Sequence, residues 1–420
     1  MNQVTGVLNK HIVPALTAVS ENTYMSAIRA GMVSVVPLTI IGGLFMVVAE
    51  FPLAAWTRLI EPWHQLLEYP FKATFGLLAV FVSFAIGHDL GRRLNQEPLS
   101  SASISALVFM LLQLQLIPGD EPRVALNMDG LGSGGLFTAI IVGLISVRVQ
   151  KFFTDRNLVI KLPESVPPVV YESFLSLVPM CVLVIVFWGI RFGLGVDVNH
   201  QIQTLFKPLV FALNTLPGIL VYAFCVTLLW SVGINGDNAM DAVVAPVFLA
   251  GLAANAEALS AGQPMTNITA LGFFTTFVNV GGTGATLGLA LIMLNSKEPG
   301  YRKVSRLSLP TQVFQINEPI FFGFPIVLNP IFMIPYILNA LLLTASTYLL
   351  MHWGVIQKPF VNVPWTTPPI IGHYLVTGGD WKAAVWGVCS IVLAMLVYYP
   401  FAKAAERQRL KAEAAGVAHE

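Results

Sequence analysis

Long stretches without charge recur along the chain, separated by short segments in which charged residues collect. Most of these stretches are close to the ~20 residues that an α-helix needs to cross about 30 Å of hydrocarbon. Several stretches contain no Asp, Glu, Lys or Arg, among them Ala30–Ala49, Ala73–His88, Pro98–Gly119, Gly130–Val147, Phe174–Ile190, Pro208–Gly236, Ala258–Ser296, Pro319–Gln357 and Ala383–Ala402. The pattern predicts an all-α polytopic membrane protein with about ten transmembrane helices.

Two of the later stretches, Ala258–Ser296 and Pro319–Gln357, are longer than one crossing needs and are interrupted by Gly, Pro or Asn. Such interruptions leave backbone groups unpaired, and a membrane tolerates these only where the chain is buried in protein or lines a wet cavity. We therefore expect re-entrant hairpins in the C-terminal half.

Composition agrees with a membrane protein, because 55% of the 420 residues are hydrophobic and only 11% are charged. The formal net charge is +1, and no long run of one sign indicates a nucleic-acid surface. Cys181, Cys225 and Cys389 each lie in an apolar stretch without CxxC spacing. We expect them to be small buried residues, and we expect no disulfide, metal site or cofactor.

Lysine and arginine collect in alternate connections and so indicate the orientation. The basic groups are Arg92 and Arg93; Arg148, Lys151, Arg156 and Lys161; Lys297, Arg302, Lys303 and Arg306; and Lys403, Arg407, Arg409 and Lys411. These connections are expected in the cytoplasm, together with both termini, and the acidic loop "LIPGDEPRVALNMDG" is expected outside. The first residues are too polar for a signal peptide and lack a cleavage motif.

The chain is expected to divide once. Residues 1–165 form a scaffold and dimerisation region that continues through a helix at 166–196, and residues 197–216 form an amphipathic linker helix. Residues 217–402 form the working domain, and residues 403–420 form a cytoplasmic tail.

Two polar clusters stand out in the working domain. "SVGINGDNAMDAVVAP" carries Asn235, Asp237 and Asn238 as candidate ligand-binding groups, or else it is an Asn-Gly turn with ordinary helix caps. "NVGGTGATLG" carries Asn279, Gly281 and Gly282. This turn either offers free N–H groups to a hydroxyl-bearing or anionic ligand, or it allows close helix packing by small residues.

The third cluster, "QINEPIFFGFPIVLNP", centres on Glu318. A carboxylate in a membrane segment costs about 2–3 kcal/mol on insertion scales, so it is first interpreted as functional. Asn317 and Pro319 favour a rigid turn that aims the side chain. The alternative is a cytoplasmic loop residue that caps the next helix.

Nearly the whole chain resembles the membrane-embedded enzyme IIC component of the bacterial phosphoenolpyruvate-dependent sugar phosphotransferase system, in its lactose/cellobiose/diacetylchitobiose branch. The resemblance is most specific in "NEPIFFGFPIVLNP", "WSVGINGDN" and "VPWTTPPIIGHYLVTGGDW". It implies a homodimer in the bacterial cytoplasmic membrane that carries a β-linked disaccharide such as cellobiose or diacetylchitobiose inward. It also implies that the sugar 6-hydroxyl is presented to a phosphocysteine on a separate enzyme IIB.

The resemblance implies that Glu318 contacts the sugar near that hydroxyl and acts as the catalytic base. Trp365 is expected to stack on a sugar ring, or else to lie in the interfacial aromatic belt. His373 is expected to be a hydrogen-bonded structural histidine. Many relatives have histidine where this chain has Asn235, and asparagine can hydrogen-bond a hydroxyl but cannot take its proton.

The cysteines lie in membrane stretches and the chain has no soluble IIB-sized segment, so we expect the phosphoryl donor to be another polypeptide. The other partners expected are the disaccharide, membrane lipid and a second copy of the chain. The competing hypothesis is a secondary transporter that couples a sugar or small anion to protons through Glu318 and does no chemistry.

Overall fold

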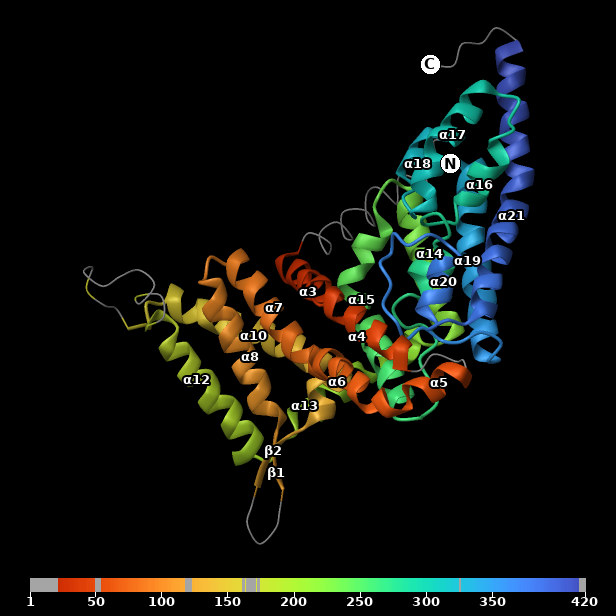
Figure 1. Cartoon of the computed structure of the whole chain (residues 1–420). Coiled ribbons are helices and arrows are strands. Elements are labelled where there is room, and N and C mark those ends of the chain that lie inside the picture. Colours follow the sequence, from red (N-terminus) through yellow and green to blue (C-terminus); the bar gives the residue numbers. More distant parts are fainter. Residues whose placement is uncertain are drawn as a thin grey trace. The chain divides into compact units, whose positions relative to one another are not determined.

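The computed structural model describes residues 22–49, 54–117, 123–160, 163, 171, 174–324 and 326–414. By contacts, the chain divides into two compact units (Figure 1). Unit 1 comprises residues 1–45, 63–210 and 241–257, and unit 2 comprises residues 46–62, 211–240 and 258–420. The boundary near residue 210 lies inside the expected linker. A single division there would place residues 46–62 in unit 1 and residues 241–257 in unit 2, whereas the contacts assign these two segments the other way round. The expected domain roles remain predictions.

Unit 1 is mainly helical. Its elements are α3 (Thr23–Ser34), most of α4 (Val36–Ala49), α6 (His64–Thr74), η3 (Phe75–Leu77), α7 (Leu78–Arg93), α8 (Pro98–Gln113), β1 (Leu114–Ile117), β2 (Arg123–Leu126), α9 (Met128–Leu131), η4 (Ser133–Gly135), α10 (Leu136–Asp155), α12 (Leu177–Trp188), η5 (Gly189–Gly193), most of α13 (Val198–Leu213) and most of α15 (Gly236–Ser260). Strands β1 and β2 pair antiparallel, with Leu114 opposite Leu126. This hairpin departs from the all-α prediction, and Asp120 and Glu121 of the expected outer loop lie outside the described residues.

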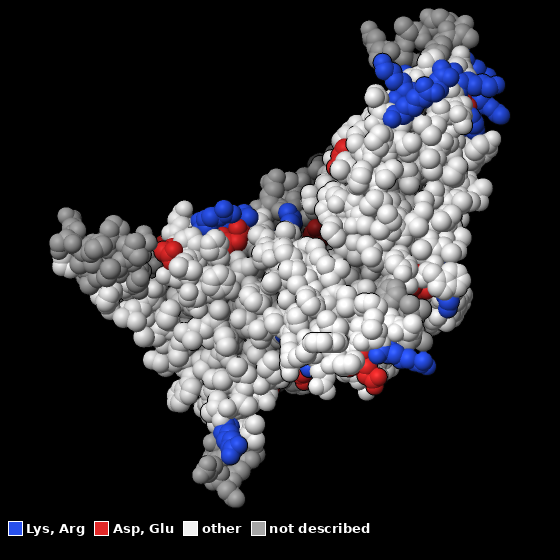
Figure 2. Space-filling view, viewed as in Figure 1, with Lys and Arg blue, Asp and Glu red and all other residues white. Residues whose placement is uncertain are grey.

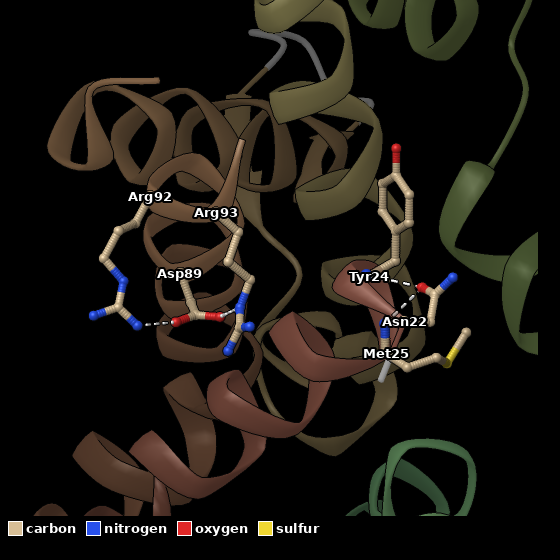
Figure 3. Close-up of polar contacts among 6 residues, drawn as sticks. All are labelled: Asn22, Tyr24, Met25, Asp89, Arg92 and Arg93. Atoms are coloured by element: carbon tan, nitrogen blue, oxygen red, sulfur yellow. Dashed lines mark hydrogen bonds and ion pairs between the residues drawn. The ribbon is translucent and has the colours of Figure 1, made fainter. Parts of the chain in front are cut away.

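Helix ends in unit 1 are fixed by local polar contacts (Figure 3). Asn22 begins α3 by accepting hydrogen bonds from the backbone N–H groups of Tyr24 and Met25, at 2.9 and 3.3 Å. Asp89 pairs with Arg92 at 2.9 Å and Arg93 at 2.5 Å in the last turn of α7. The two arginines therefore stay at the negative end of the helix dipole, where cations are favoured.

Small residues let α7 and α8 pack closely. A Cβ on Gly87 would lie 2.4 Å from Ser105 Oγ, and one on Gly91 would lie 2.5 Å from Ser101 Oγ. Ser83 Oγ also donates to the carbonyl of Ser105 at 3.0 Å. Close approach of backbones with interhelical hydrogen bonds is typical of helices that associate in lipid.

Unit 2 combines long helices with irregular, buried chain. Its elements are the end of α4, α5 (Ala54–Ile60), most of η2 (Glu61–Trp63), the end of α13, α14 (Leu216–Ser231), the start of α15 (Gly236–Ser260), η6 (Phe273–Val278), α16 (Leu287–Met293), α17 (Pro299–Val313), α18 (Glu318–Gly323), α19 (Pro330–His352), α20 (Ile371–Val376) and α21 (Trp381–Ala414). Helix α14 packs on α19, α19 on α21 and α16 on α21 (Figure 1). Residues 268–286 are turns and a π-helical segment, mostly buried, as expected for irregular backbone in a membrane domain.

Within the described residues, six helical segments are long and apolar enough to cross a membrane, or seven if a pair bent by 87° counts as one span. The six are Thr23–Ala49, Ala55–Arg93, Ser133–Asp155, Val243–Ser260, Pro330–His352 and Trp381–Lys411. The membrane class is therefore confirmed, whereas the number of about ten is not. The cysteine prediction is wrong in part, because Cys181 and Cys389 are exposed on their helices in the single chain.

Candidate functional site

Asp237 joins two of the three polar clusters within unit 2. Its Oδ2 accepts hydrogen bonds from Thr283 Oγ1 at 2.6 Å and from Trp230 Nε1 at 2.8 Å. Its Oδ1 is 3.5 Å from Asn279 Nδ2. Asp237 and Trp230 belong to the "WSVGINGDN" segment, and Asn279 and Thr283 belong to the glycine-rich turn. The first turn of α15 is therefore tied to that turn by one carboxylate.

The glycine-rich turn needs its glycines for both conformation and space. Gly281, Gly282 and Gly284 have φ values of 78°, 99° and 77°, a region that side chains disfavour. A Cβ on Gly282 would lie 2.5 Å from Asn317 Cβ, and one on Gly284 would lie 2.2 Å from the ring of Tyr336. The turn therefore packs directly against the third cluster and against α19.

Gln315 and Asn317 complete the connection to the third cluster. The N–H groups of Gly281 and Gly282 donate to Gln315 Oε1 at 2.7 and 3.2 Å. Asn317 Nδ2 donates to the carbonyl of Thr283 at 2.8 Å. These two glycine N–H groups are thus bonded to protein, and the observed contacts match the close-packing alternative. A role for Gly281, Gly282 or Asn317 in binding a ligand remains a prediction.

Glu318 is exposed and is the first residue of α18. The preceding Asn317 is buried, and its carbonyl accepts from the N–H groups of Ile320 and Phe321 at 3.1 and 2.9 Å. Among the described contacts, the Glu318 carboxylate accepts no hydrogen bond from the backbone N–H groups at the start of α18, so the capping alternative is not observed there. The Glu318 side chain is thus exposed at the start of α18, and its contact with a ligand remains a prediction.

Asn235 caps a helix, as its alternative interpretation predicted. Its Oδ1 accepts from the backbone N–H of Asn238 at 2.9 Å in the first turn of α15. The Nδ2 amide is the part of Asn235 that can meet a ligand. Asn238 is exposed, and Trp365 is 59% exposed in the loop before α20. Their contacts with a ligand remain predictions, as does that of Asn279.

Asn235 caps the helix with Oδ1 and can meet a ligand with Nδ2. Different substitutions should therefore change protein stability and ligand affinity separately. We expect Asn235→Ala to lower the free energy of unfolding by about 1 kcal/mol through the lost cap. It should also weaken sugar binding by about 1–3 kcal/mol through an unpaired hydroxyl. Asn235→Asp keeps the cap oxygen and removes the donor, so it should lose affinity but not stability. Thermal unfolding in detergent and sugar titration measure both, and unchanged affinity in both variants would remove Asn235 from the site.

Asn235→His introduces the histidine that the family resemblance leads us to expect at this position. We expect a folded, binding-competent protein whose pH–rate profile changes between about pH 5 and 8, since histidine has a reference pKa near 6.5. Wild type, assayed over the same range, is the control. A profile identical to wild type would show that position 235 does not face the reacting group.

Four residues of this network were not predicted from the sequence, namely Trp230, Thr283, Gln315 and Tyr336. Trp230 lies in "WSVGINGDN", Thr283 in "NVGGTGATLG" and Gln315 at the start of "QINEPIFFGFPIVLNP". Their position in these polar motifs is the sequence signal that could have identified them. Tyr336 lies in an apolar stretch, fully buried, and its hydroxyl makes no hydrogen bond within the described part of the chain. Its ring lies against Gly284 of the glycine-rich turn.

His373 has the buried position expected of a structural histidine but not the hydrogen bonds. It is 0% exposed, and its ring centroid is 4.6 Å from that of Phe277. Neither ring nitrogen has a hydrogen-bond partner among the described residues. The expected hydrogen bonds are therefore absent among the described residues, and the buried ring makes an edge-to-face contact with Phe277 instead.

Comparisons with known proteins identify the family. The family model described as "Phosphotransferase system, EIIC" matches residues 29–340. The "Lichenan permease IIC component" of Bacillus subtilis (strain 168) is 33% identical over 98% of this chain and 96% of that protein. The "PTS system cellobiose-specific EIIC component" of Geobacillus stearothermophilus is 32% identical over 99% and 97%.

A solved structure is also similar. It is the transporter ChbC, the IIC component from the N,N'-diacetylchitobiose-specific phosphotransferase system, with a TM-score of 0.90 and 32% sequence identity. The similarity covers 98% of this chain and 100% of that one. The family match extends over most of the sequence and includes all three joined clusters up to Tyr336. The chain therefore belongs to the membrane-embedded EIIC family of the sugar phosphotransferase system.

Proposed function

We propose that this protein carries a β-linked disaccharide, such as cellobiose or diacetylchitobiose, into the cell. It presents the sugar 6-hydroxyl to a phosphocysteine on a separate enzyme IIB. The substrate class rests on relatives named for lichenan and cellobiose and on a similar structure named for diacetylchitobiose. The observation that carries the proposal is the hydrogen-bonded cluster of Asp237, Thr283, Gln315 and Asn317, which ends at the open carboxylate of Glu318.

Glu318 is the general base in this proposal. A sugar hydroxyl is a poor nucleophile, and a positioned base speeds its attack by about 10²–10⁴-fold. As the 6-hydroxyl oxygen bonds to phosphorus, its proton passes to the Glu318 carboxylate. The P–S bond breaks, and the cysteine of IIB leaves as a thiolate. The product gains about two negative charges and is therefore retained in the cytoplasm.

Polar side chains around Glu318 hold the sugar in place. Asn235, Asn238 and Asn279 donate hydrogen bonds to the sugar or accept them from it. Asp237 ties the start of α15, which carries Asn235 and Asn238, to the glycine-rich turn, which carries Asn279. The Oδ1 atom of Asn279 is buried without a hydrogen-bond partner in the described chain, so it can accept from a sugar hydroxyl. Trp365, being exposed and in a loop, stacks its ring on one face of a pyranose.

The wider architecture follows the same proposal. The short apolar helices Pro98–Gln113 and Leu216–Ser231, the bent pair and the irregular chain around η6 supply further crossings and re-entrant hairpins. About ten spans then place both termini in the cytoplasm. Residues 1–196 serve as a scaffold that forms a homodimer, residues 197–216 as a linker, and residues 217–402 as the transport domain with a cytoplasmic tail.

Reconstituted vesicles test this function. The protein is supplied with a phosphorylated cellobiose-class IIB and a panel of β-linked disaccharides, and sugar phosphate is measured. We expect sugar phosphate only when both the protein and the phosphorylated IIB are present. Uptake of unmodified sugar driven by a proton gradient, with no sugar phosphate, would instead identify a secondary transporter.

A further inference from the structure

Lysine and arginine gather at one end of unit 2, over the start of α17 and the last turns of α21 (Figure 2). We call this surface the basic platform. Its exposed cations are Lys297, Arg302, Lys303, Arg306, Arg407 and Lys411. Arg302 and Arg306 are four residues apart on α17, as are Arg407 and Lys411 on α21, so each pair lies on one helix face.

The carboxylates of the same segments are turned inward. Glu298 is 2% exposed and accepts hydrogen bonds from the N–H groups of Gly300 at 2.9 Å and Tyr301 at 2.5 Å. Glu406 is 4% exposed and accepts from Ser296 Oγ at 2.6 Å and from Lys403 Nζ at 2.7 Å. These are the two acidic residues within 296–311 and 403–411. The charge that these segments expose is therefore positive.

The same buried groups make the platform rigid. Glu406 Oε1 also accepts from the backbone N–H of Lys297 at 2.5 Å, which joins α21 to the turn before α17. Arg409 Nε lies 3.6 Å from Glu298 Oε1, and its guanidinium lies 4.9 Å from the centre of the Tyr301 ring. Cations from two distant parts of the sequence are thus held on one body. Basic residues whose only role is to set the orientation of the protein in the membrane do not need to be held in fixed positions by buried carboxylates.

The platform also extends beyond the hydrocarbon. Helix α21 has 34 residues, which correspond to about 51 Å, whereas the hydrocarbon is about 30 Å thick. Its charge-rich last turns therefore leave the apolar region, on the side that the basic residues mark as cytoplasmic. Helix α17 runs from the platform to residues 314–317 and then to Glu318, so the platform and the proposed base belong to one continuous segment.

We propose that the basic platform is the docking surface for an acidic face of the phosphorylated IIB protein, an inference that rests on the proposed function. Positive and negative surfaces steer association and fix orientation. A partner held against α17 brings its phosphocysteine toward the segment that carries Glu318. Anionic lipid is the competing occupant, and it is less suited to a surface that projects past the membrane edge.

A matched pair of double variants tests the platform, using the full chain in nanodiscs and a cysteine-phosphorylated cellobiose-class IIB as the probe. Arg302→Gln/Arg306→Gln removes two platform charges. Arg148→Gln/Arg156→Gln removes two exposed charges of unit 1, one in α10 and one at the residue that follows it, and is the control. For the platform variant, we expect the IIB concentration at half-maximal rate to rise about tenfold at low salt. This difference should shrink at high salt, with sugar affinity unchanged.

The control variant should stay within about twofold of wild type at every salt concentration. Equal IIB dependence in both variants would overturn the proposal. So would a difference that appears with phosphatidylglycerol and vanishes with phosphatidylcholine, because that result assigns the platform to lipid. Direct binding of IIB to wild type and variant, measured without sugar, keeps the test valid even if wild type makes no sugar phosphate, which would refute only the proposed function.

Discussion

Glu318→Gln is expected to reduce sugar phosphorylation about 100-fold or more while sugar affinity changes little. Glutamine keeps the size and hydrogen bonding of the side chain but cannot accept the hydroxyl proton, and a lost general base costs about 10²–10⁴-fold. The neighbouring backbone is held by Asn317, whose side chain and carbonyl are both bonded, so the new side chain starts from the same position. Turnover and equilibrium sugar binding of the purified variant measure the two effects separately.

Glu61→Gln is the matched control, because Glu61 is an exposed glutamate of the same unit outside the three clusters. It should leave both turnover and affinity unchanged. Wild-type turnover in the Glu318→Gln protein would contradict the assignment of Glu318 as the general base. A parallel loss of affinity and turnover would assign Glu318 to sugar binding instead.

The membrane class and the motif positions could be predicted from the sequence, because long apolar stretches and a carboxylate among them carry strong physical signals. Helix α19, for example, lies inside the predicted stretch Pro319–Gln357. Helix α17 was expected to be a basic cytoplasmic connection. Its buried face is formed by Tyr301, Ser305, Ser308 and Gln312. Because these residues are mostly polar and lie among exposed polar residues, the sequence shows no apolar pattern that would have predicted a buried helix.

The connections between the motifs could not be predicted. A polar residue in apolar surroundings needs a partner, but one sequence does not say which. Asp237 is 46 residues from Thr283, and Gln315 is 34 residues from Gly281. Gln315 has a positive φ of 67°, a backbone conformation that is uncommon for glutamine and so could not be predicted from its residue type. The three clusters could therefore be located from the sequence, whereas the hydrogen bonds among them required coordinates, and their role as a site remains a prediction.

Asp237→Ala is expected to lower the free energy of unfolding by about 2–4 kcal/mol and to abolish measurable sugar binding. The change leaves the Trp230 indole N–H and the Thr283 hydroxyl without their acceptor, and a buried donor left unpaired costs about 1–3 kcal/mol. It also frees the glycine-rich turn from the start of α15, so the groups proposed to hold the sugar lose their common anchor. Unfolding in detergent and sugar titration measure the two losses.

Thr283→Val is the matched control, because it removes one donor and keeps the side-chain volume. It should cost about 1 kcal/mol and leave sugar binding detectable. The double variant should be little worse than Asp237→Ala alone, since both changes break the same bond and effects at contacting residues do not add. Additive losses would mean that Asp237 and Thr283 stabilise the protein independently. Full stability and affinity in Asp237→Ala would show that the carboxylate does not hold the first turn of α15 and the glycine-rich turn together.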